Sequence, residues 1–145
     1  MKVVNEAKLE FPGLSANEAF ARSCAACFAA QLDPTLEELG DLKTAVSEAV
    51  TNSIVHAYPD TLGRVALRLR ILEGDTLEIR VRDWGIGIPD VDQAMQPLFT
   101  TGGEERSGMG FSIMECFMDS LKVRSAPGRG TTVTMRKHIA GKERQ

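Results

Sequence analysis

The stretch Arg82-Asp83-Trp84-Gly85-Ile86-Gly87-Ile88-Pro89 directly follows the alternating segment Leu77-Glu78-Ile79-Arg80-Val81. Successive side chains of a strand point to opposite faces, so Asp83 shares the apolar, core-facing side with positions 77, 79 and 81. A carboxylate there needs partners, because burying it alone is costly. Gly85 and Gly87 then offer backbone freedom and room for a ligand to approach closely. Taken alone, this stretch favours the plainer interpretation, a strand whose Asp83 caps its own glycine-rich turn, so a ligand site has to be argued from the rest of the chain.

The other alternating segments predict a sheet with one apolar face. Residues 64–71 alternate as strictly as 77–83, and Glu73-Gly74-Asp75 joins the two as an antiparallel hairpin. Further strands are expected at 3–11, 122–125 and 131–137, the last of which turns Thr131 inward to meet Asp83. One apolar face per strand predicts helices on one side only. The expected fold is therefore an α/β (α+β) two-layer sandwich with a mixed, mostly antiparallel sheet.

The first helix is expected to begin at a capping box formed by Ser15 and Glu18. Its apolar stripe is predicted from helical spacing as Phe20, Cys24, Cys27 and Phe28. Cys24 and Cys27 form a C-x-x-C pair, which raises redox or metal chemistry. We favour small core residues, because both cysteines lie on the stripe and no second cysteine pair exists. Arg22 lies off the stripe and is expected to be exposed.

A second helix is predicted from Pro34 or Thr35 to about Tyr58, where Pro59 stops it. Its expected apolar side consists of Leu39, Leu42, Val46, Ala49, Val50 and Ile54. Glu48 and Asn52 are four residues apart and therefore project together beside this apolar side. A solvated polar edge is the plain interpretation of that pair.

After Pro89, a short helical turn is expected at 91–96, followed by a polar, glycine-containing loop around 102–107 that is a lid candidate. The segment Ser107-Gly108-Met109-Gly110 then opens a third helix. The stripe predicted for that helix consists of Ile113, Met114, Phe117 and Leu121.

Composition indicates one soluble domain over residues 1–145. A net charge of −3 argues weakly against nucleic acid as the main partner. No run of residues is long and apolar enough to span a membrane, and the N-terminus lacks the apolar core of a signal peptide. Three cysteines in an unexported chain suggest reduced thiols, so a cytoplasmic location is expected.

Taken together, these segments favour a nucleotide site. Gly108 and Gly110 at a helix N-terminus offer free N–H groups and a positive dipole end, which suit phosphate. A buried Asp83, assisted by Thr131, suits the exocyclic amine of a base and disfavours the carbonyl of guanine. Glu48 and Asn52 suit a proton acceptor and Mg²⁺ near the phosphates. The Walker A motif and the H-R-D and D-F-G motifs of ordinary protein kinases are absent.

Three motifs, Glu48-x-x-x-Asn52, Asp83-x-Gly85-x-Gly87 and Gly108-x-Gly110-Phe111, resemble the N, G1 and G2 boxes of the Bergerat-type (GHKL) ATPases. Segments 47–52, 96–101 and 105–111, with Ile113-Met-Glu115, are similar to the anti-sigma-F factors, a serine-protein kinase family within that superfamily. This resemblance runs over nearly the whole chain.

The resemblance assigns a role to each matching position. It implies Glu48 as general base, Asn52 as Mg²⁺ ligand, and Arg106 as the lid arginine that stabilises charge at the γ-phosphoryl group. It further implies adenine contacts from Asp83 and Thr131, with other nucleotide contacts from Gly85, Gly87, Gly108, Met109 and Gly110. Arg22 matches the arginine for which the two protein partners compete.

The resemblance also implies partners and an activity. The family sequesters a sporulation sigma factor of the sigma-F type and uses MgATP to phosphorylate a serine of an anti-anti-sigma factor, as a homodimer that binds ATP or ADP. Two alternatives stay open, namely a general-stress (sigma-B type) anti-sigma serine kinase and a non-catalytic, ATP-dependent sigma-binding module. A histidine kinase catalytic domain is disfavoured, because the chain has no room for a separate phosphoacceptor helical pair.

Overall fold

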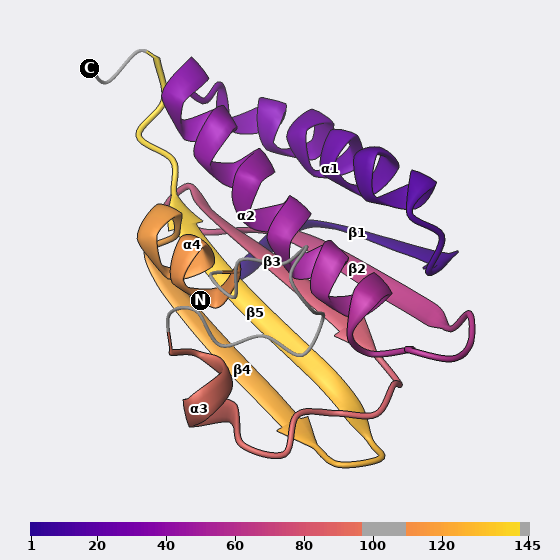
Figure 1. Ribbon diagram of the computed structural model, residues 1–145. Helices are drawn as coiled ribbons and strands as arrows, with labels where there is room; N and C mark the ends of the chain where they lie inside the picture. The colour runs from indigo at the N-terminus through magenta and orange to yellow at the C-terminus, as the bar shows by residue number, and fades with distance from the viewer. Residues whose placement is uncertain (97–109, 143–145) are drawn as a thin grey trace.

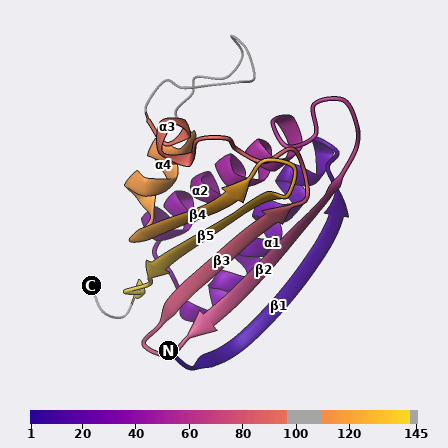
Figure 2. The same ribbon diagram turned by 90° about the horizontal axis from the view of Figure 1, so that it is seen from below.

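The computed structural model describes residues 1–96 and 110–142 (Figure 1). In chain order its elements are β1 (Val3–Pro12), α1 (Ala16–Ala29), the 3-10 turn η1 (Ala30–Leu32), α2 (Leu36–Val55), β2 (Arg64–Leu72), β3 (Thr76–Asp83), α3 (Val91–Ala94), α4 (Gly110–Phe117), β4 (Ser120–Ala126) and β5 (Gly130–His138). The strands form one five-stranded sheet in the order β1-β2-β3-β5-β4 (Figure 2).

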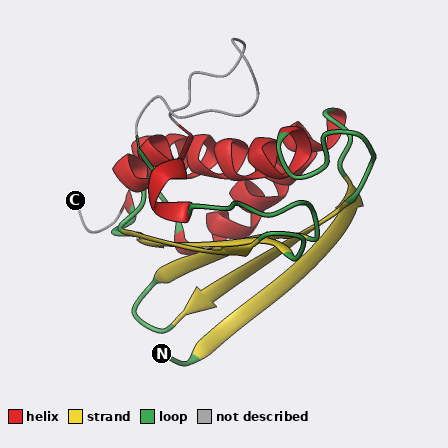
Figure 3. Cartoon of the chain, turned by 60° about the horizontal axis from the view of Figure 1, so that its bottom comes forward, coloured by secondary structure: helices red, strands yellow, loops and turns green. Residues whose placement is uncertain are grey.

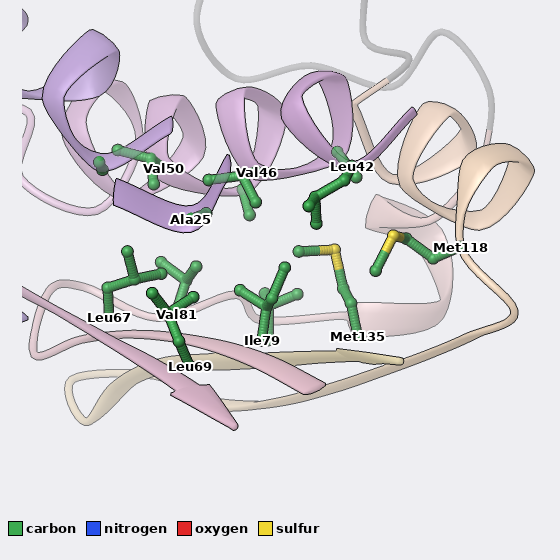
Figure 4. Close-up of a cluster of buried hydrophobic side chains, with 14 of the residues drawn as sticks. Ala25, Leu42, Val46, Val50, Leu67, Leu69, Ile79, Val81, Met118 and Met135 are labelled. Carbon is green, nitrogen blue, oxygen red and sulfur yellow. The ribbon is translucent and has the colours of Figure 1, made fainter. Parts of the chain in front are cut away.

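The sheet and the helices form two layers, with α1, α2 and α4 over one face and the other face open (Figure 3). The core lies between the layers. Its strand residues are those of the predicted inward parity, including Leu67, Ile79 and Met135, and they face Val46 and Leu42 of α2 (Figure 4). The alternation in β2 and β3 therefore correctly predicted which side of the sheet is buried, and the two-layer fold is confirmed.

The sheet differs from the prediction in being antiparallel throughout rather than mixed. All four pairings between the five described strands are antiparallel. The hairpin between β2 and β3 is confirmed, and both Gly74 and Asp75 in its turn have positive φ angles. The pairing of β1 with β2 has a register irregularity between Val3 and Asn5. Thr131 lies directly opposite Asp83, as predicted from the strand parity.

The predicted apolar stripe of the first helix is only partly correct, since Phe28 packs against the core and Cys24 is partly buried, but neither is fully buried. The residues that α1 buries are Ala21, Ala25 and Ala29, spaced four apart, whereas Phe20 is 50% exposed and Cys27 is exposed. Alanines allow α1 to approach β2 and α2 closely, so the larger side chains turn outward or to the edge of the core. The capping box is wrong, because Ser15 has a helical backbone and its side chain caps nothing.

The second helix follows the prediction more closely. A capping box is present there, with Thr35 accepting from the Glu38 N–H and Glu38 accepting from the Thr35 N–H. The apolar residues predicted for α2 are all buried or packed against the core. The helix predicted after Gly110 is α4. Met114 is buried there as expected, but α4 ends at Phe117, so Leu121 belongs to β4 instead. The lid candidate lies outside the described residues.

Candidate functional site

The carboxylate of Asp83 is the best-defined group of the site. It ends β3, is only 3% exposed, and faces the helix layer. Its Oδ1 accepts hydrogen bonds from the N–H groups of Gly85 (3.0 Å) and Thr131 (3.2 Å), and its Oδ2 accepts from the hydroxyl of Ser53 (2.9 Å). Burial raises the pKa of Asp83, and these three hydrogen bonds act in the opposite direction. The alternative in which Asp83 caps its own loop is therefore partly correct, because Gly85 is one of the three donors.

The loop after Asp83 is closely packed against two neighbouring elements. The Ile86 N–H donates to the carbonyl of Ala57 just after α2, and the Gly128 N–H donates to the Ile86 carbonyl. A side chain at Gly85 would collide with the backbone of Ala57, and one at Gly87 would collide with the backbone of Ala126. Both glycines are therefore required for packing, whatever they contribute to a ligand.

Three further residues support this region and were missed by the sequence analysis, namely Ser53, Ser125 and Gly130. Ser125 accepts from the Ile88 N–H (2.7 Å) and lies 2.8 Å from the Thr131 hydroxyl. Gly130 has φ +92° and approaches Asp83 so closely that a Cβ would collide with the Asp83 carbonyl. Of these three, only Ser53 could have been found from the sequence. It follows Ala49 at helical spacing and is therefore a polar residue on the buried side of α2.

The second part of the site joins α2 to the start of α4. Glu48 and Asn52 are both partly buried on one side of α2. A Cβ built on Gly110 would lie 3.2 Å from Glu48 Oε2 and 3.3 Å from Asn52 Nδ2. Gly110 thus provides the space in which the carboxylate and the amide stand beside the N-terminal end of α4. The solvated-edge interpretation of Glu48 and Asn52 is therefore incomplete, since both are partly exposed but lie beside the start of α4.

These two parts are connected through neighbouring residues on α2. Asn52 faces Gly110, while Ser53, the next residue, donates to Asp83. The described residues therefore bring Glu48, Asn52, Gly110, Asp83 and Thr131 to one side of the sheet. Three predicted site residues, Arg106, Gly108 and Met109, lie outside the described residues.

Arg22 lies on α1 near this site and is partly exposed, so the prediction of an exposed side chain is met only in part. Its side chain is 37% exposed, and its Nη1 lies 3.3 Å from Glu18 Oε1 and 3.3 Å from Ser47 Oγ. Ser47 immediately precedes Glu48. The guanidinium of Arg22 therefore links α1 to α2 beside the predicted general base.

Neither the tryptophan nor the cysteines join the site. Guanidinium groups of Arg64 and Arg82 lie over the ring of Trp84, at 3.8 and 4.7 Å from its centroid, on the side of the sheet away from the helices. The three cysteines are free thiols, and Cys27 and Cys116 are exposed. Within residues 1–96 and 110–142, no group of three His, Cys, Asp or Glu residues could hold a metal ion.

The chain is similar to known proteins over nearly its whole length. A family model described as the histidine kinase-like ATPase domain matches residues 11–137. An anti-sigma F factor of Caldanaerobacter subterraneus subsp. tengcongensis is 56% identical over 140 residues, which cover 96% of this chain and 97% of the relative. The chain belongs to the anti-sigma F factor family. Another member, from Geobacillus kaustophilus, is 55% identical over 138 residues and 94% of both chains.

Solved structures of other proteins show the same fold as this chain. The RsbU and RsbW domains of Rv1364c from Mycobacterium tuberculosis align with a TM-score of 0.66 at 15% identity, over 94% of this chain and 33% of that one. The histidine kinase domain of a blue-light activated histidine kinase from Erythrobacter litoralis aligns with a TM-score of 0.59 at 24% identity, over 85% and 61%. At these identities the likeness concerns the fold alone.

Membership of the family indicates what kind of ligand the chain binds. An ATPase domain implies nucleotide binding, and the buried carboxylate with the polar groups beside Gly110 forms a chemically suitable site for one. None of the described helices is long and apolar enough to cross a membrane.

Proposed function

We propose that residues 1–145 form one cytoplasmic domain that sequesters a sigma-F type sigma factor and uses MgATP to phosphorylate a serine of an anti-anti-sigma factor. The sigma-factor part rests on the names of relatives that are 56% and 55% identical over nearly the whole chain. The kinase part rests on one observation, namely the approach of Gly110 to Glu48 and Asn52.

In this proposal, Asp83 receives the exocyclic amine of adenine. Among the described residues its carboxylate accepts hydrogen bonds from neutral donors and forms no ion pair, so its charge would be available to accept that hydrogen bond. Thr131, whose N–H donates to this carboxylate, has its hydroxyl 2.8 Å from that of Ser125. Gly85 and Gly87 place the loop beside the base.

The phosphates would then lie toward the beginning of α4, near Gly108, Met109 and Gly110, and the Asn52 amide oxygen would be a ligand of Mg²⁺. Mg²⁺ commonly uses one or two protein oxygens together with substrate phosphates, so the described residues fit it without a carboxylate cluster. When bound, Mg²⁺ supplies charge neutralisation at the phosphates. Glu48 would accept the proton of the attacking serine hydroxyl, and Arg106 would stabilise charge on the transferred group.

Arg22 would hold both protein partners in turn. Its contact with Ser47, the residue before Glu48, supports this role, because a partner bound at Arg22 would lie near Glu48. The exposed side chains of Phe20 and Leu14 on the same helix and its entry supply apolar area for such a partner. We include a homodimer in the proposal on the basis of the resemblance, and light scattering of the purified protein tests it.

The kinase is tested by incubating the protein with γ-labelled ATP and a serine-bearing anti-anti-sigma factor. Glu48→Gln should reduce the rate of phosphoserine formation by about a hundredfold or more, because the hydroxyl loses its proton acceptor. Glu37→Gln, on the exposed first turn of the same helix, is the matched control and should leave the rate unchanged.

Nucleotide affinity and sigma-factor binding are measured on the same variants. If the wild-type protein forms no phosphoserine but still binds the sigma factor in a nucleotide-dependent manner, the non-catalytic module replaces the kinase. If a sigma-B type factor is bound in preference to a sigma-F type factor, the stress-response alternative is correct. A loss of phosphoserine in Glu37→Gln equal to that in Glu48→Gln would contradict the assigned role of Glu48.

A further inference from the structure

The face of the sheet away from the helices (Figure 3) is here called the open face. It concentrates positive charge in an acidic chain. The five strands place three glutamates on it, Glu6, Glu10 and Glu78, and nine basic side chains: Lys8, Arg64, Arg68, Arg70, Arg80, Arg82, Lys122, Arg124 and Arg136. These include nine of the 17 Lys and Arg residues of the chain but three of its 20 Asp and Glu residues. The open face is therefore strongly cationic while the remainder of the chain is acidic.

The compensating carboxylates occupy one part of the open face. Glu78 lies 3.0 Å from Arg68, 3.9 Å from Arg70 and 2.8 Å from Arg136. Glu6 lies 3.3 Å from Arg70 in the same cross-strand row. This row contains as many carboxylates as basic side chains, so its ion pairs stabilise the fold and it contributes no excess positive charge.

The next row of the sheet carries the excess. The strand register places Lys8 beside Arg68, Arg68 beside Arg80, and Thr134 between Arg80 and Lys122. Arg82 and Arg124 flank this row on its other side. Together Lys8, Arg68, Arg80, Arg82, Lys122 and Arg124 are called the cationic stripe. Lys8 and Arg68 pair with Glu6 (3.5 Å) and Glu78 (3.0 Å), whereas in the described part of the chain Arg80, Arg82, Lys122 and Arg124 form no ion pair.

Such a row is unfavourable for the isolated fold. Like charges directly opposite each other across a sheet are destabilising, and Arg68 and Arg80 are in that position. Partial burial lowers the pKa of Arg80, as do the neighbouring charges of Arg68, Arg70 and Arg82. An anion that covered the stripe would relieve this repulsion.

We propose that the cationic stripe docks an acidic, extended segment of a protein partner. Five strands about 4.8 Å apart give the stripe a length of roughly 19 Å, which matches about six residues of extended chain. Guanidinium groups bind carboxylates in bidentate fashion, which suits a stripe rich in arginine. This surface is on the opposite side of the sheet from the nucleotide site, so the proposal is independent of the proposed function.

The other anionic or protein occupants fit less well. A long nucleic acid would extend beyond the stripe onto an acidic surface, and the chain as a whole carries a charge of −3. A second copy of this chain could not use the stripe in a two-fold symmetric interface, because cations would meet cations.

The probe is a fluorescein-labelled peptide of eight residues, six of them glutamate, with a glutamine peptide as its partner control. The measurement is fluorescence anisotropy at 50 and 200 mM salt with the full chain. The test variant is Arg80→Gln/Lys122→Gln/Arg124→Gln. The matched control is Lys2→Gln/Lys43→Gln/Arg129→Gln, which removes the same charge from exposed positions outside the stripe. Emission of Trp84 provides a second readout, because Arg82 lies over its ring.

The proposal expects the glutamate peptide to bind with salt-sensitive affinity and to change the emission of Trp84. The test variant should bind it about tenfold more weakly, with its thermal unfolding and ADP affinity unchanged or improved, while the control variant binds within twofold of wild type. The proposal is overturned if neither peptide binds, if both triple variants lose affinity equally, or if a single-stranded DNA of twenty nucleotides binds more tightly than the peptide.

Discussion

Two carboxylates on the same strand, Glu78 and Asp83, are almost equally buried but are satisfied in different ways. Glu78, 4% exposed, lies on the open face and contacts the guanidinium groups of Arg68, Arg70 and Arg136. Asp83, 3% exposed, lies on the helix side, and its partners among the described residues are all neutral donors. A buried anion that is fully paired with cations serves the fold, whereas one held by neutral donors keeps its charge available for a ligand.

Glu78→Gln should have the largest effect and should act on stability alone. The substitution leaves three guanidinium groups without their shared anion, and breaking a buried ion pair from one side costs about 3 kcal/mol of the free energy of unfolding. Urea denaturation measures this value. Nucleotide affinity, measured by calorimetry on the folded variant, should stay within twofold of wild type.

The matched control is Glu10→Gln on the same face, where the glutamate is 56% exposed and lies 3.7 Å from Arg64. It should change the free energy of unfolding by less than about 0.5 kcal/mol, since exposed ion pairs contribute little. An equal effect of the two substitutions would remove the distinction between a buried and an exposed anion on this face.

Asp83→Asn should have the next largest effect and should act on binding rather than on stability. The amide has the shape of the carboxylate, but it loses the charge-assisted acceptor, which is worth about 2 kcal/mol or roughly a 30-fold loss of ATP affinity. The affinity for GTP should change far less, so the ratio of ATP affinity to GTP affinity should decrease. Calorimetric titration of both nucleotides measures this outcome.

The stability of Asp83→Asn provides the control for that prediction. Because burial raises the pKa of Asp83, the ionised carboxylate disfavours the folded state at neutral pH, and the amide should therefore unfold no more easily than wild type. Asp75→Asn, in the β2–β3 turn, should leave ATP affinity unchanged. If Asp83→Asn retains wild-type ATP affinity, the assignment of Asp83 to the base is wrong.

Much of the fold followed from strand parity, because alternation over eight residues leaves only one way to bury the apolar side. The placement of Asp83 opposite Thr131 is an example. The buried residues of α1 could not be predicted in the same way. Helical spacing alone favoured Phe20 and Cys24, whereas the folded protein buries the alanines, which let the helix approach its neighbours closely. The sequence pattern cannot show how far apart two layers lie.

The capping boxes show the same limit. Ser15 and Thr35 each precede a glutamate by three residues, yet only Thr35 has the extended backbone that lets its side chain reach the helix N–H groups. In the site, the motifs located Glu48, Asn52 and Asp83. They did not reveal that Ser53 and Gly130 would fix the position of the Asp83 carboxylate, because those contacts join distant segments.

A pH series distinguishes Asp83 from a third carboxylate, Glu38, and carries the smallest expected effect. Burial acts to raise the pKa of Glu38, but hydrogen bonds from the N–H groups of Thr35, Ala140 and Gly141 outweigh it, so the pKa is lowered. A lowered folded-state pKa contributes stability above the ordinary carboxyl pKa, and that stability is lost as the pH falls through the folded value. Asp83 has the opposite sign, because its raised pKa favours the folded state at low pH.

Glu38→Gln should therefore cost about 1 kcal/mol at neutral pH, with the difference from wild type shrinking as the pH falls. Asp83→Asn should show a difference of the opposite sign at neutral pH, which also shrinks on acidification. Urea denaturation of wild type and both variants from pH 7 to pH 3 measures the three profiles, and Glu37→Gln provides a control on the exposed side of the same helix turn. A shifted pKa requires the difference in free energy of unfolding between variant and wild type to change with pH. Parallel profiles for all variants would therefore mean that folding shifts the pKa of neither carboxylate.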